Sequence, residues 1–545
     1  MSKMCKFSWL VSFAALIIVA VIPAANGTSI ITEPGRQTKI YGKDFFVVVP
    51  LTAGIPEEGS VFQIACVSCS GTSVTGSIAL LQGNFSASFN ACPTISVSLD
   101  ISALEPLANE TTPAIFNVTA DANITVSVII KVRGALTAFT AIPLASLDLL
   151  YLVASYGLKQ DLSELTVVAH EDDTLVRFMP NSSGVTIRGD SLLSTNLTSV
   201  IDTGEWVEYR TVGSFMGGKL EANKSVSVIV GTRCKRPRQG CPLTMEQLYP
   251  LVSLGTKYTA VPVKGVSNIF RAVAVWDNTT ISFGNSNENG SLTLNNGQVE
   301  DLTLKETGYI DGSKPFLLLH HITMGVPVLK TATVTVPPAE QFTHETVTFS
   351  TYLGADTNNI TITAPCKYIE SISISMLIVG RISVSSAVKK RSSEEGYCGV
   401  NRPIDAGTYV IGPDNFPDAV YSATLYGRTD QSVFAYILAT ELNQVTCSVD
   451  YATQEVQLCN YPMSTVTATD FTVETSTVPE NEKSTAIGTI VAVVIAAISI
   501  SAGCAVMGIC LYRYWKGKRW RRLDESEYME DNPIRMQELN LGCRM

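Results

Sequence analysis

The chain has 545 residues, of which 46% are hydrophobic and 16% are charged. A chain of this length is too long for a single β-sandwich core, so we expect several structural units. Acidic residues outnumber basic residues by 49 to 39, which gives a formal net charge of −10, and we expect no nucleic-acid partner.

Residues 1–27 have the features of a secretory signal peptide. Lys3 and Lys6 precede an apolar run at residues 9–21, and the small residues Ala25 and Gly27 follow it. This order of basic, apolar and small residues predicts cleavage near Gly27 and entry into the secretory pathway. The alternative is an N-terminal membrane anchor, but the apolar run is short for a transmembrane helix.

Residues 28–460 contain an internal repeat. The sequence ANKSVSVIV at residues 222–230 resembles ANITVSVII at residues 122–130, about 100 positions earlier. Likewise, PLASLDLLY at residues 143–151 has a counterpart, PLVSLGTKY, at residues 250–258. Weaker copies flank this pair, and such similarity marks one structural unit that is copied along the chain. We therefore predict about four units of roughly 100 residues each.

The repeated region has the composition of antiparallel β-structure. Val, Ile, Thr and Ser are abundant, and apolar residues alternate with polar ones in segments such as residues 95–100. Short Asn-Gly, Asp-Gly and Gly-Ser turns separate these segments. We predict an all-β fold of tandem, sandwich-like antiparallel units. The alternative is a closed β-propeller in which each repeat supplies two four-stranded blades.

Asn-x-Ser/Thr sequons are frequent in the same region. Such tripeptides also occur by chance, but their density behind a signal peptide favours a glycosylated outer surface. Asn123 and Asn223 occupy equivalent places in the two similar segments, so we expect both at the exposed entrance of a strand. The candidate glycosylation sites are Asn84, Asn109, Asn117, Asn123, Asn181, Asn196, Asn223, Asn278, Asn289 and Asn359.

Nine of the 13 cysteines lie in residues 28–460. In an oxidising compartment, near neighbours in the sequence are plausible disulfide partners. The candidate pairs are Cys234 with Cys241, Cys366 with Cys398, and Cys447 with Cys459.

Cys66, Cys69 and Cys92 then supply one further pair and one spare thiol. The spare thiol is either a buried free cysteine or a link to a second chain. The Cys66–Cys69 spacing also occurs at zinc and redox sites, but no second such motif or nearby histidine accompanies it, and we favour a structural disulfide.

The segment from His170 to Asp173 gathers an imidazole and three carboxylates, which raises the question of a metal or catalytic site. The equivalent segment of the next repeat keeps only the aspartate, Asp277, which favours a hairpin turn. His320 and His321 end a strand-like run, and we expect a partly exposed strand surface there rather than a metal pair. No GxSxG, HExxH or P-loop motif is present, so we expect no catalytic residue, no cofactor and no metal.

The segment CKRPRQGC between Cys234 and Cys241 concentrates positive charge in an acidic protein. A constrained cationic loop can hold sulfated or sialylated glycans through charge-assisted hydrogen bonds. The alternative is an ordinary solvated turn. The candidate ligand-binding residues are Arg233, Lys235, Arg236 and Arg238.

The C-terminal part is predicted to anchor the chain in a membrane. Residues 461–485 are rich in Ser and Thr and are typical of a stalk or a flexible linker. Residues 486–511 form an apolar span that is about 39 Å long as a helix, enough to cross a bilayer with tilt. Basic residues follow immediately and predict a single-pass type I orientation at the plasma membrane, with the N-terminus outside the cell.

The predicted cytoplasmic tail, residues 512–545, is too short for a folded enzyme. Tyr528 lies among acidic residues and is a candidate phosphorylation site, the alternative being an unmodified tail. Small residues in the span, or the unpaired cysteine, are two routes by which a homodimer would form.

Several ordered segments resemble the IgGFc-binding protein N-terminal domain family. They run from about residue 42 to residue 439 and include GKDFFVVVP, PLASLDLLYLVAS, LTVVAHEDDTLVRF, EQLYPLVSLGTKY, FRAVAVWDNTTISF, SKPFLLLHH and PPAEQF. The resemblance implies an extracellular binding protein, mucosal or at the cell surface, and it transfers no catalytic or ligand residue. Unlike larger members, this chain lacks von Willebrand type D repeats and ends in a predicted membrane anchor.

From these features we expect a glycosylated cell-surface binding or adhesion protein for an extracellular protein or glycan, with a role in immune or mucosal defence. One alternative is a structural coat or mucus-associated component. A second is an extracellular hydrolase, which would need carboxylates that converge in one pocket.

Overall fold

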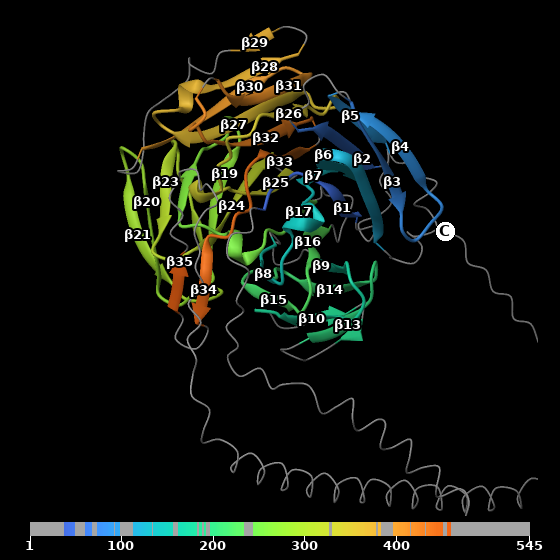
Figure 1. Ribbon diagram of the computed structural model, residues 1–545. Coiled ribbons are helices and arrows are strands. Elements are labelled where there is room, and N and C mark those ends of the chain that lie inside the picture. Colours follow the sequence, from blue (N-terminus) through green and yellow to red (C-terminus); the bar gives the residue numbers. More distant parts are fainter. Residues whose placement is uncertain are drawn as a thin grey trace, which may run out of the picture. The chain divides into compact units, whose positions relative to one another are not determined.

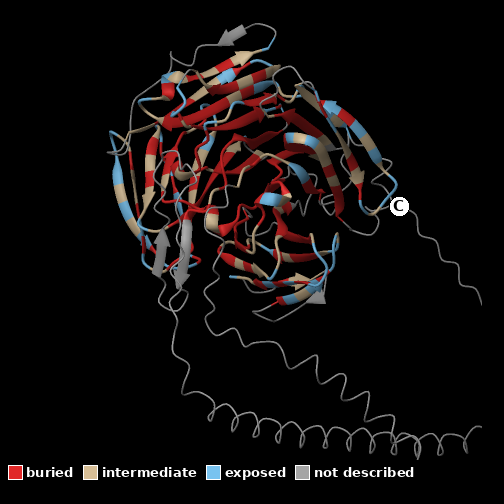
Figure 2. Ribbon diagram, in the orientation of Figure 1, coloured by how far each residue is buried: buried red, intermediate tan, exposed pale blue. Residues whose placement is uncertain are grey.

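Two burial patterns distinguish the strands of the computed structural model. In β10 (Thr174–Met179), buried and exposed residues alternate, as expected for a strand with one covered face. In β9 (Leu162–Ala169) and β33 (Val433–Ala439), nearly every residue is buried, so both faces are covered. Figure 2 shows this contrast between inner and outer strands.

The structure describes residues 38–458, with gaps at residues 50–59, 68–72, 92, 99–112, 133–134, 156–161, 182–184, 188–189, 192–196, 234–242, 326–329, 378–379, 383–395, 415, 431 and 451–454. All the described residues belong to one compact unit, Met1–Tyr461.

The first repeat is a seven-stranded sheet folded into two layers. Its long strand β6 takes part in both layers, because its first half pairs with β1 and β3 and its second half with β2 and β7. The strands are β1 (Gly42–Val49), β2 (Ser60–Cys66), β3 (Val74–Leu80), β4 (Ser86–Ala91), β5 (Thr94–Ser98), β6 (Ala114–Val132) and β7 (Ala135–Thr140).

The second repeat has a four-stranded sheet, in the order β13-β10-β15-β8, and a six-stranded sheet, in the order β12-β11-β14-β9-β16-β17. Both sheets contribute to one hydrophobic core that includes Tyr151, Val167, Phe178 and Val228. Besides β9 and β10, its elements are the 3-10 turn η2 (Leu144–Ser146), β8 (Leu150–Val153), β11 (Thr186–Ile187), β12 (Asp190–Ser191), β13 (Leu197–Ile201), β14 (Trp206–Val212), β15 (Gly218–Ala222), β16 (Val226–Arg233) and β17 (Thr244–Gln247).

The third repeat pairs two four-stranded sheets, β18-β23-β20-β21 and β22-β19-β24-β25, around a core that includes Tyr258, Phe270, Ile281 and Phe316. Its elements are the 3-10 turn η3 (Leu251–Ser253), β18 (Lys257–Ala260), β19 (Ser267–Ala274), β20 (Thr279–Gly284), β21 (Asn289–Leu294), β22 (Val299–Leu302), β23 (Gly308–Gly312), β24 (Phe316–Met324) and β25 (Lys330–Thr335).

The fourth repeat has the sheets β26-β31-β28-β29 and β30-β27-β32-β33, and a two-stranded hairpin follows it. Its elements are the 3-10 turns η4 (Ala339–Gln341) and η5 (Ile369–Ser371), β26 (Val347–Ser350), β27 (Thr357–Pro365), β28 (Ile372–Met376), β29 (Gly380–Ile382), β30 (Tyr397–Ile404), β31 (Thr408–Pro413), β32 (Ser422–Arg428) and β33. The hairpin is β34 (Thr446–Asp450) with β35 (Glu455–Leu458).

The last strands of the four repeats, β7, β17, β25 and β33, contact one another in cyclic order, and Figure 1 shows them gathered at the centre. The Met245 amide donates to Thr137 Oγ1 at 3.0 Å, which joins β17 to β7. The Leu136 amide donates to Ser432 Oγ at 2.7 Å, which joins β7 to the start of β33. The four sandwiches therefore close into a ring.

Backbone contacts between the two ends of the array complete this ring. Lys39 forms an isolated antiparallel bridge with Glu441, and the Leu442 amide donates to the Thr38 carbonyl at 2.8 Å. The Thr38 hydroxyl donates in return to the Leu442 carbonyl. The segment before the first repeat is thus held against the end of the fourth.

The similar segments of the sequence occupy equivalent places in successive repeats. Pro143, Pro250 and Pro338 each precede a three-residue 3-10 turn at the start of a new repeat. The hydroxyls of Tyr151 and Tyr258 are both buried, and each donates to the carbonyl of the first residue of an inner strand, Val226 or Phe316. The recurring tyrosine therefore ties two sheets together in each repeat.

The prediction of an all-β fold with several antiparallel sheets is confirmed. The repeats are sandwiches, as predicted. They also close into a ring, which is a feature of the propeller alternative. The predicted transmembrane helix at residues 486–511 lies outside the described residues. In the part of the chain that the structure describes, no helix is long and apolar enough to span a bilayer.

One predicted disulfide, between Cys366 and Cys398, is present. Cys66 is also disulfide-bonded. Cys69, Cys92, Cys234, Cys241 and Cys459 lie outside the described residues, as does the side chain of Cys447, so those pairings stay predictions.

The approach of two glycine turns, one from the second repeat and one from the third, gives a first prediction. A Cβ on Gly217, which has φ +80°, would lie 2.4 Å from the Gly297 carbonyl oxygen. Gly265 has a similar φ of +78°, but nothing lies within 4 Å of its Cβ position. Gly217→Ala should therefore lower the free energy of unfolding by roughly 2 kcal/mol more than Gly265→Ala, measured by urea denaturation. Equal losses would show that the two turns do not pack as described.

The Cys366–Cys398 bridge gives a second prediction. Replacing both cysteines with alanine should lower the free energy of unfolding by about 3.7 kcal/mol, because the unfolded chain regains the freedom of the closed loop. Guanidinium denaturation without reductant measures this loss. With reductant, the difference between the two proteins should largely disappear, and a persistent difference would attribute the effect to lost packing instead.

Candidate binding surface

A groove of about 560 Å³ lies between β1, β6 and η2. The two strands present cross-strand pairs to it, Asp44 opposite Thr119 and Phe46 opposite Asn117. On the other side, η2 contributes Leu144 and its neighbours. The groove is therefore lined by aromatic, charged and amide side chains, a mixture that suits a polar ligand with apolar faces.

An irregularity in the strand pairing opens this groove. Gly42 pairs with Ile124, whereas Asp44 pairs with Thr119, so four residues of β6 lie opposite the single residue Lys43. Asp121 holds the resulting bend, because its carboxylate accepts hydrogen bonds from the amide and the hydroxyl of Thr75 at 3.0 and 2.8 Å. The bend is held by these hydrogen bonds, and the space of the groove lies beside it.

A charged cluster lies at one end of the groove, where the first and fourth repeats meet. Lys39 Nζ and the Tyr41 hydroxyl both donate to Glu345 Oε1 at 2.9 Å. Partial burial disfavours the ionised form of Glu345, but the hydrogen bonds from Lys39 and Tyr41 outweigh it and hold the pKa of Glu345 below its ordinary value. Sequence analysis missed this cluster because its members lie about 300 positions apart and no local pattern links them.

At the other end, Phe46 packs against His170 of the second repeat, with ring centroids 4.6 Å apart. His170 Nε2 lies 3.0 Å from Ser227 Oγ, and burial lowers the pKa of His170 to about 4. His170 is therefore neutral at pH 7. Residues that line the groove therefore contact both neighbours of the first repeat in the ring, the fourth repeat through Glu345 and the second through His170.

The acidic segment after His170 is a tight turn, as expected. Asp173 and its equivalent Asn278 both have φ of 54°, and Thr174 and Thr279 each donate a hydroxyl hydrogen bond back across the turn. The expectation of a hairpin was wrong, because β9 and β10 pair with other strands and belong to different sheets. The turn instead crosses from one layer of the sandwich to the other.

His320 and His321 correct another expectation, since both side chains are buried rather than partly exposed. The ring of His320 stacks on Phe270 with centroids 4.3 Å apart, and its nitrogens lie 3.0 Å from the Tyr426 hydroxyl and 2.9 Å from Asn268 Oδ1. The two side chains point to opposite faces of β24, and the sequence pattern failed because both faces are covered at these positions. His320 meets Tyr426 of the fourth repeat, and His321 Nδ1 lies 2.7 Å from Thr333 Oγ1. Among the described residues, no three His, Cys, Asp or Glu side chains gather in a way that could hold a metal ion.

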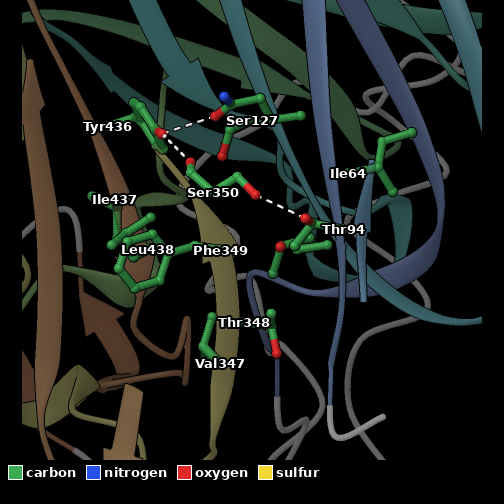
Figure 3. A pocket seen from close by; sticks show the side chains of 13 residues that line it. Ile64, Thr94, Ser127, Val347, Thr348, Phe349, Ser350, Tyr436, Ile437 and Leu438 are labelled. Carbon is green, nitrogen blue, oxygen red and sulfur yellow. Dashed lines mark hydrogen bonds between the residues drawn. The ribbon is translucent and has the colours of Figure 1, made fainter. Parts of the chain in front are cut away.

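A second cavity, between the first and fourth repeats, has a volume of about 10 Å³, which is room for one water molecule at most. Figure 3 shows the hydroxyl groups that line it. The Tyr436 hydroxyl lies 2.9 Å from Gln63 Oε1 and 3.2 Å from the Ser350 carbonyl oxygen, and Thr94 Oγ1 lies 2.7 Å from Ser350 Oγ. This cavity belongs to a polar seam that joins two repeats, and it is too small for an organic ligand.

The predicted cationic loop joins two strands that pair antiparallel, β16 and β17, with Thr232 opposite Thr244. Lys235, Arg236 and Arg238 lie outside the described residues, and so does the side chain of Arg233. Their role in binding stays a prediction. Tyr528 likewise lies outside the described residues.

Most of the candidate glycosylation sites that the structure describes are accessible. Asn117 and Asn359 are half-buried within strands, and Asn109 and Asn196 lie outside the described residues. Asn123 and Asn223 are both exposed, as expected from their equivalent positions. The exposed sites are Asn84, Asn123, Asn181, Asn223, Asn278 and Asn289.

The buried histidines give a third prediction. Burial lowers the pKa of His320 to about 3, whereas an unfolded histidine has a pKa of about 6.5. The unfolded chain therefore binds the proton first as the pH falls, and the stability that is fully present above pH 6.5 declines towards pH 3. His320→Gln should reduce this decline by about 1.4 kcal/mol per pH unit, measured by urea denaturation between pH 6.5 and 4.

The matched control for that experiment is Ser286→Gln, a substitution at an exposed position that carries no titratable group. This variant should retain the acid sensitivity of the original protein. An unchanged slope in the His320 variant would contradict the buried, neutral state of that ring.

Comparison with known proteins gives a family-model match that begins after most of the residues lining the groove. No curated protein matches the chain. A family model matches the last strand of the first repeat, the second and third repeats, and the beginning of the fourth. The match covers residues 137–392, and the family is described as IgGFc binding protein.

Proposed function

We propose that this chain is a glycosylated, single-pass type I cell-surface protein whose ring of repeats binds an extracellular protein or glycan. The observation that carries the proposal is the family-model match over residues 137–392, because the description of that family is one of binding. The membrane placement rests on the predicted signal peptide, residues 1–27, and on the predicted span, residues 486–511.

Within the matched region, the connection between β16 and β17 is the proposed contact surface. It carries Lys235, Arg236 and Arg238 in a chain whose net charge is −10. Because the strands that flank the loop are paired, both of its ends start from a fixed place on the ring. A rigid base lowers the entropy cost of binding, since fewer backbone rotations are lost on contact.

We propose that the protein acts by binding rather than by catalysis. Glycoside hydrolysis, for example, uses two carboxyl groups that face each other across the bond. Among the residues that line the groove at β1, Asp44 is the one carboxylate. The coat or mucus component and the hydrolase remain as alternative outcomes of a binding experiment.

Binding by the soluble region that ends at Asn460 tests the proposal. This form keeps all of the described residues, which belong to one compact unit. It should be screened against immunoglobulin Fc, sulfated and sialylated glycans, and a library of cell-surface proteins. We expect a specific ligand whose affinity falls about tenfold or more when Lys235, Arg236 and Arg238 are replaced with alanine, and whose binding weakens with salt.

The matched control replaces three exposed lysines elsewhere, Lys264, Lys305 and Lys367, and so removes the same charge. Equal losses in both variants would attribute binding to net charge alone. Specific binding that neither variant changes would place the contact surface elsewhere on the ring. No specific ligand at all would count against the binding proposal and favour the coat alternative.

A further inference from the structure

We propose that the groove between β1, β6 and η2 holds the inner sugars of an N-linked glycan attached to Asn123. This inference rests on the proposed passage through the secretory pathway, where such glycans are added. The occupant is therefore part of the molecule itself, namely the N-acetylglucosamine units nearest the protein.

The attachment point is held rigidly at the groove. Asn123 lies in the bend of β6 and lines the groove. Its carbonyl accepts a hydrogen bond from the Val67 amide at 3.1 Å, and the neighbouring Asp121 carbonyl accepts one from Lys43 Nζ at 2.8 Å. The backbone is thus fixed on both sides of the bend, while the side chain of Asn123 is exposed. A sugar attached there starts from the wall of the groove.

The lining of the groove suits N-acetylglucosamine. Tyr41 and Leu144 are partly exposed and offer apolar surface for the acetamido methyl group and the faces of the sugar rings. Lys43 and Asp44 offer a donor and an acceptor for hydroxyl and amide groups. The volume of about 560 Å³ falls in the range of small-molecule sites. Because the glycan is tethered, its effective concentration is high and weak contacts are enough to hold it.

The second sequon of the groove is placed differently. Asn117 is half-buried and pairs with Phe46 of β1 on one side and with Ala79 of β3 on the other. Its side chain belongs to the floor of the groove, beneath the space that the Asn123 glycan would fill. We therefore expect Asn117 to remain unmodified.

The repeat supplies a natural comparison site. Asn223 occupies the equivalent position in the second repeat and is exposed, but it does not line this groove. Its Oδ1 accepts a hydrogen bond from the Leu175 amide at 2.8 Å, so its side chain lies against β10. A glycan on Asn223 extends into solvent and should be released freely by an amidase.

The test uses the full-length chain produced in mammalian cells and solubilised in detergent. Mass spectrometry of glycopeptides measures the occupancy of each sequon, and digestion of the native protein with peptide N-glycosidase measures the rate of release at each site. We expect Asn123 to be occupied and Asn117 to be empty. Release at Asn123 should be at least about tenfold slower than at Asn223, and the two rates should agree after denaturation.

A variant that fills the groove tests whether slow release at Asn123 is due to the groove or to the folded state in general. Ala145 is exposed in η2 and lines the groove, so Ala145→Trp should displace the sugars and raise the native release rate at Asn123 to that of Asn223. Ser286→Trp, at an exposed position in the loop between β20 and β21, should leave both rates unchanged.

Three results would overturn the inference. Equal native release rates at Asn123 and Asn223 would show that the groove does not hold the glycan. If Asn223 carried a glycan and Asn123 did not, there would be no sugar to fill the groove. If no sequon carried a glycan, the secretory placement would fail as well, so this result is distinct from the other two.

Discussion

The structure depends on the need to cover inner sheets on both faces. A single repeat buries one face of each sheet in its own core, but a strand such as β33 is apolar on the second face as well. Leaving that face in water would cost about 1.5 to 3 kcal/mol for each large aliphatic side chain. Each repeat therefore needs neighbours, and four repeats in a ring give every inner sheet a neighbour on both sides.

Closure of the ring brings together parts of the chain that are far apart in sequence. Leu136 and Ala138 of β7 pack in one core with Phe434 and Tyr436 of β33. Polar contacts accompany this apolar contact, as at Gln63 and Tyr436, so the buried hydroxyl and amide groups of the seam retain hydrogen-bond partners. Lys39 and Glu345 add an ion pair at the same junction. Both ends of the array are thereby held, and the groove at β1 has a rigid frame.

The candidate sites occupy places where the repeat pattern is interrupted. The groove exists because β6 runs through both layers of the first repeat and bends at Asp121, whereas the second repeat ends one strand at Ala222 and begins the next at Val226. The cationic loop lies between two paired strands, β16 and β17. In regular strands the backbone groups are hydrogen-bonded and the side chains are packed. Bends and loops, which depart from the pattern, leave surface available for recognition.

The sequence by itself determined the β-class, the approximate repeat length, the equivalent tyrosines and prolines, and the Cys366–Cys398 pair. These features are local or repeated, because alternation, turn residues and short cysteine spacing act over a few residues or recur at a fixed interval. Only the tertiary structure decided that β9 and β10 belong to different sheets, that His320 and His321 are buried, and that Lys39 meets Glu345. Each of these depends on which distant strand covers a given face, and no local pattern specifies that contact.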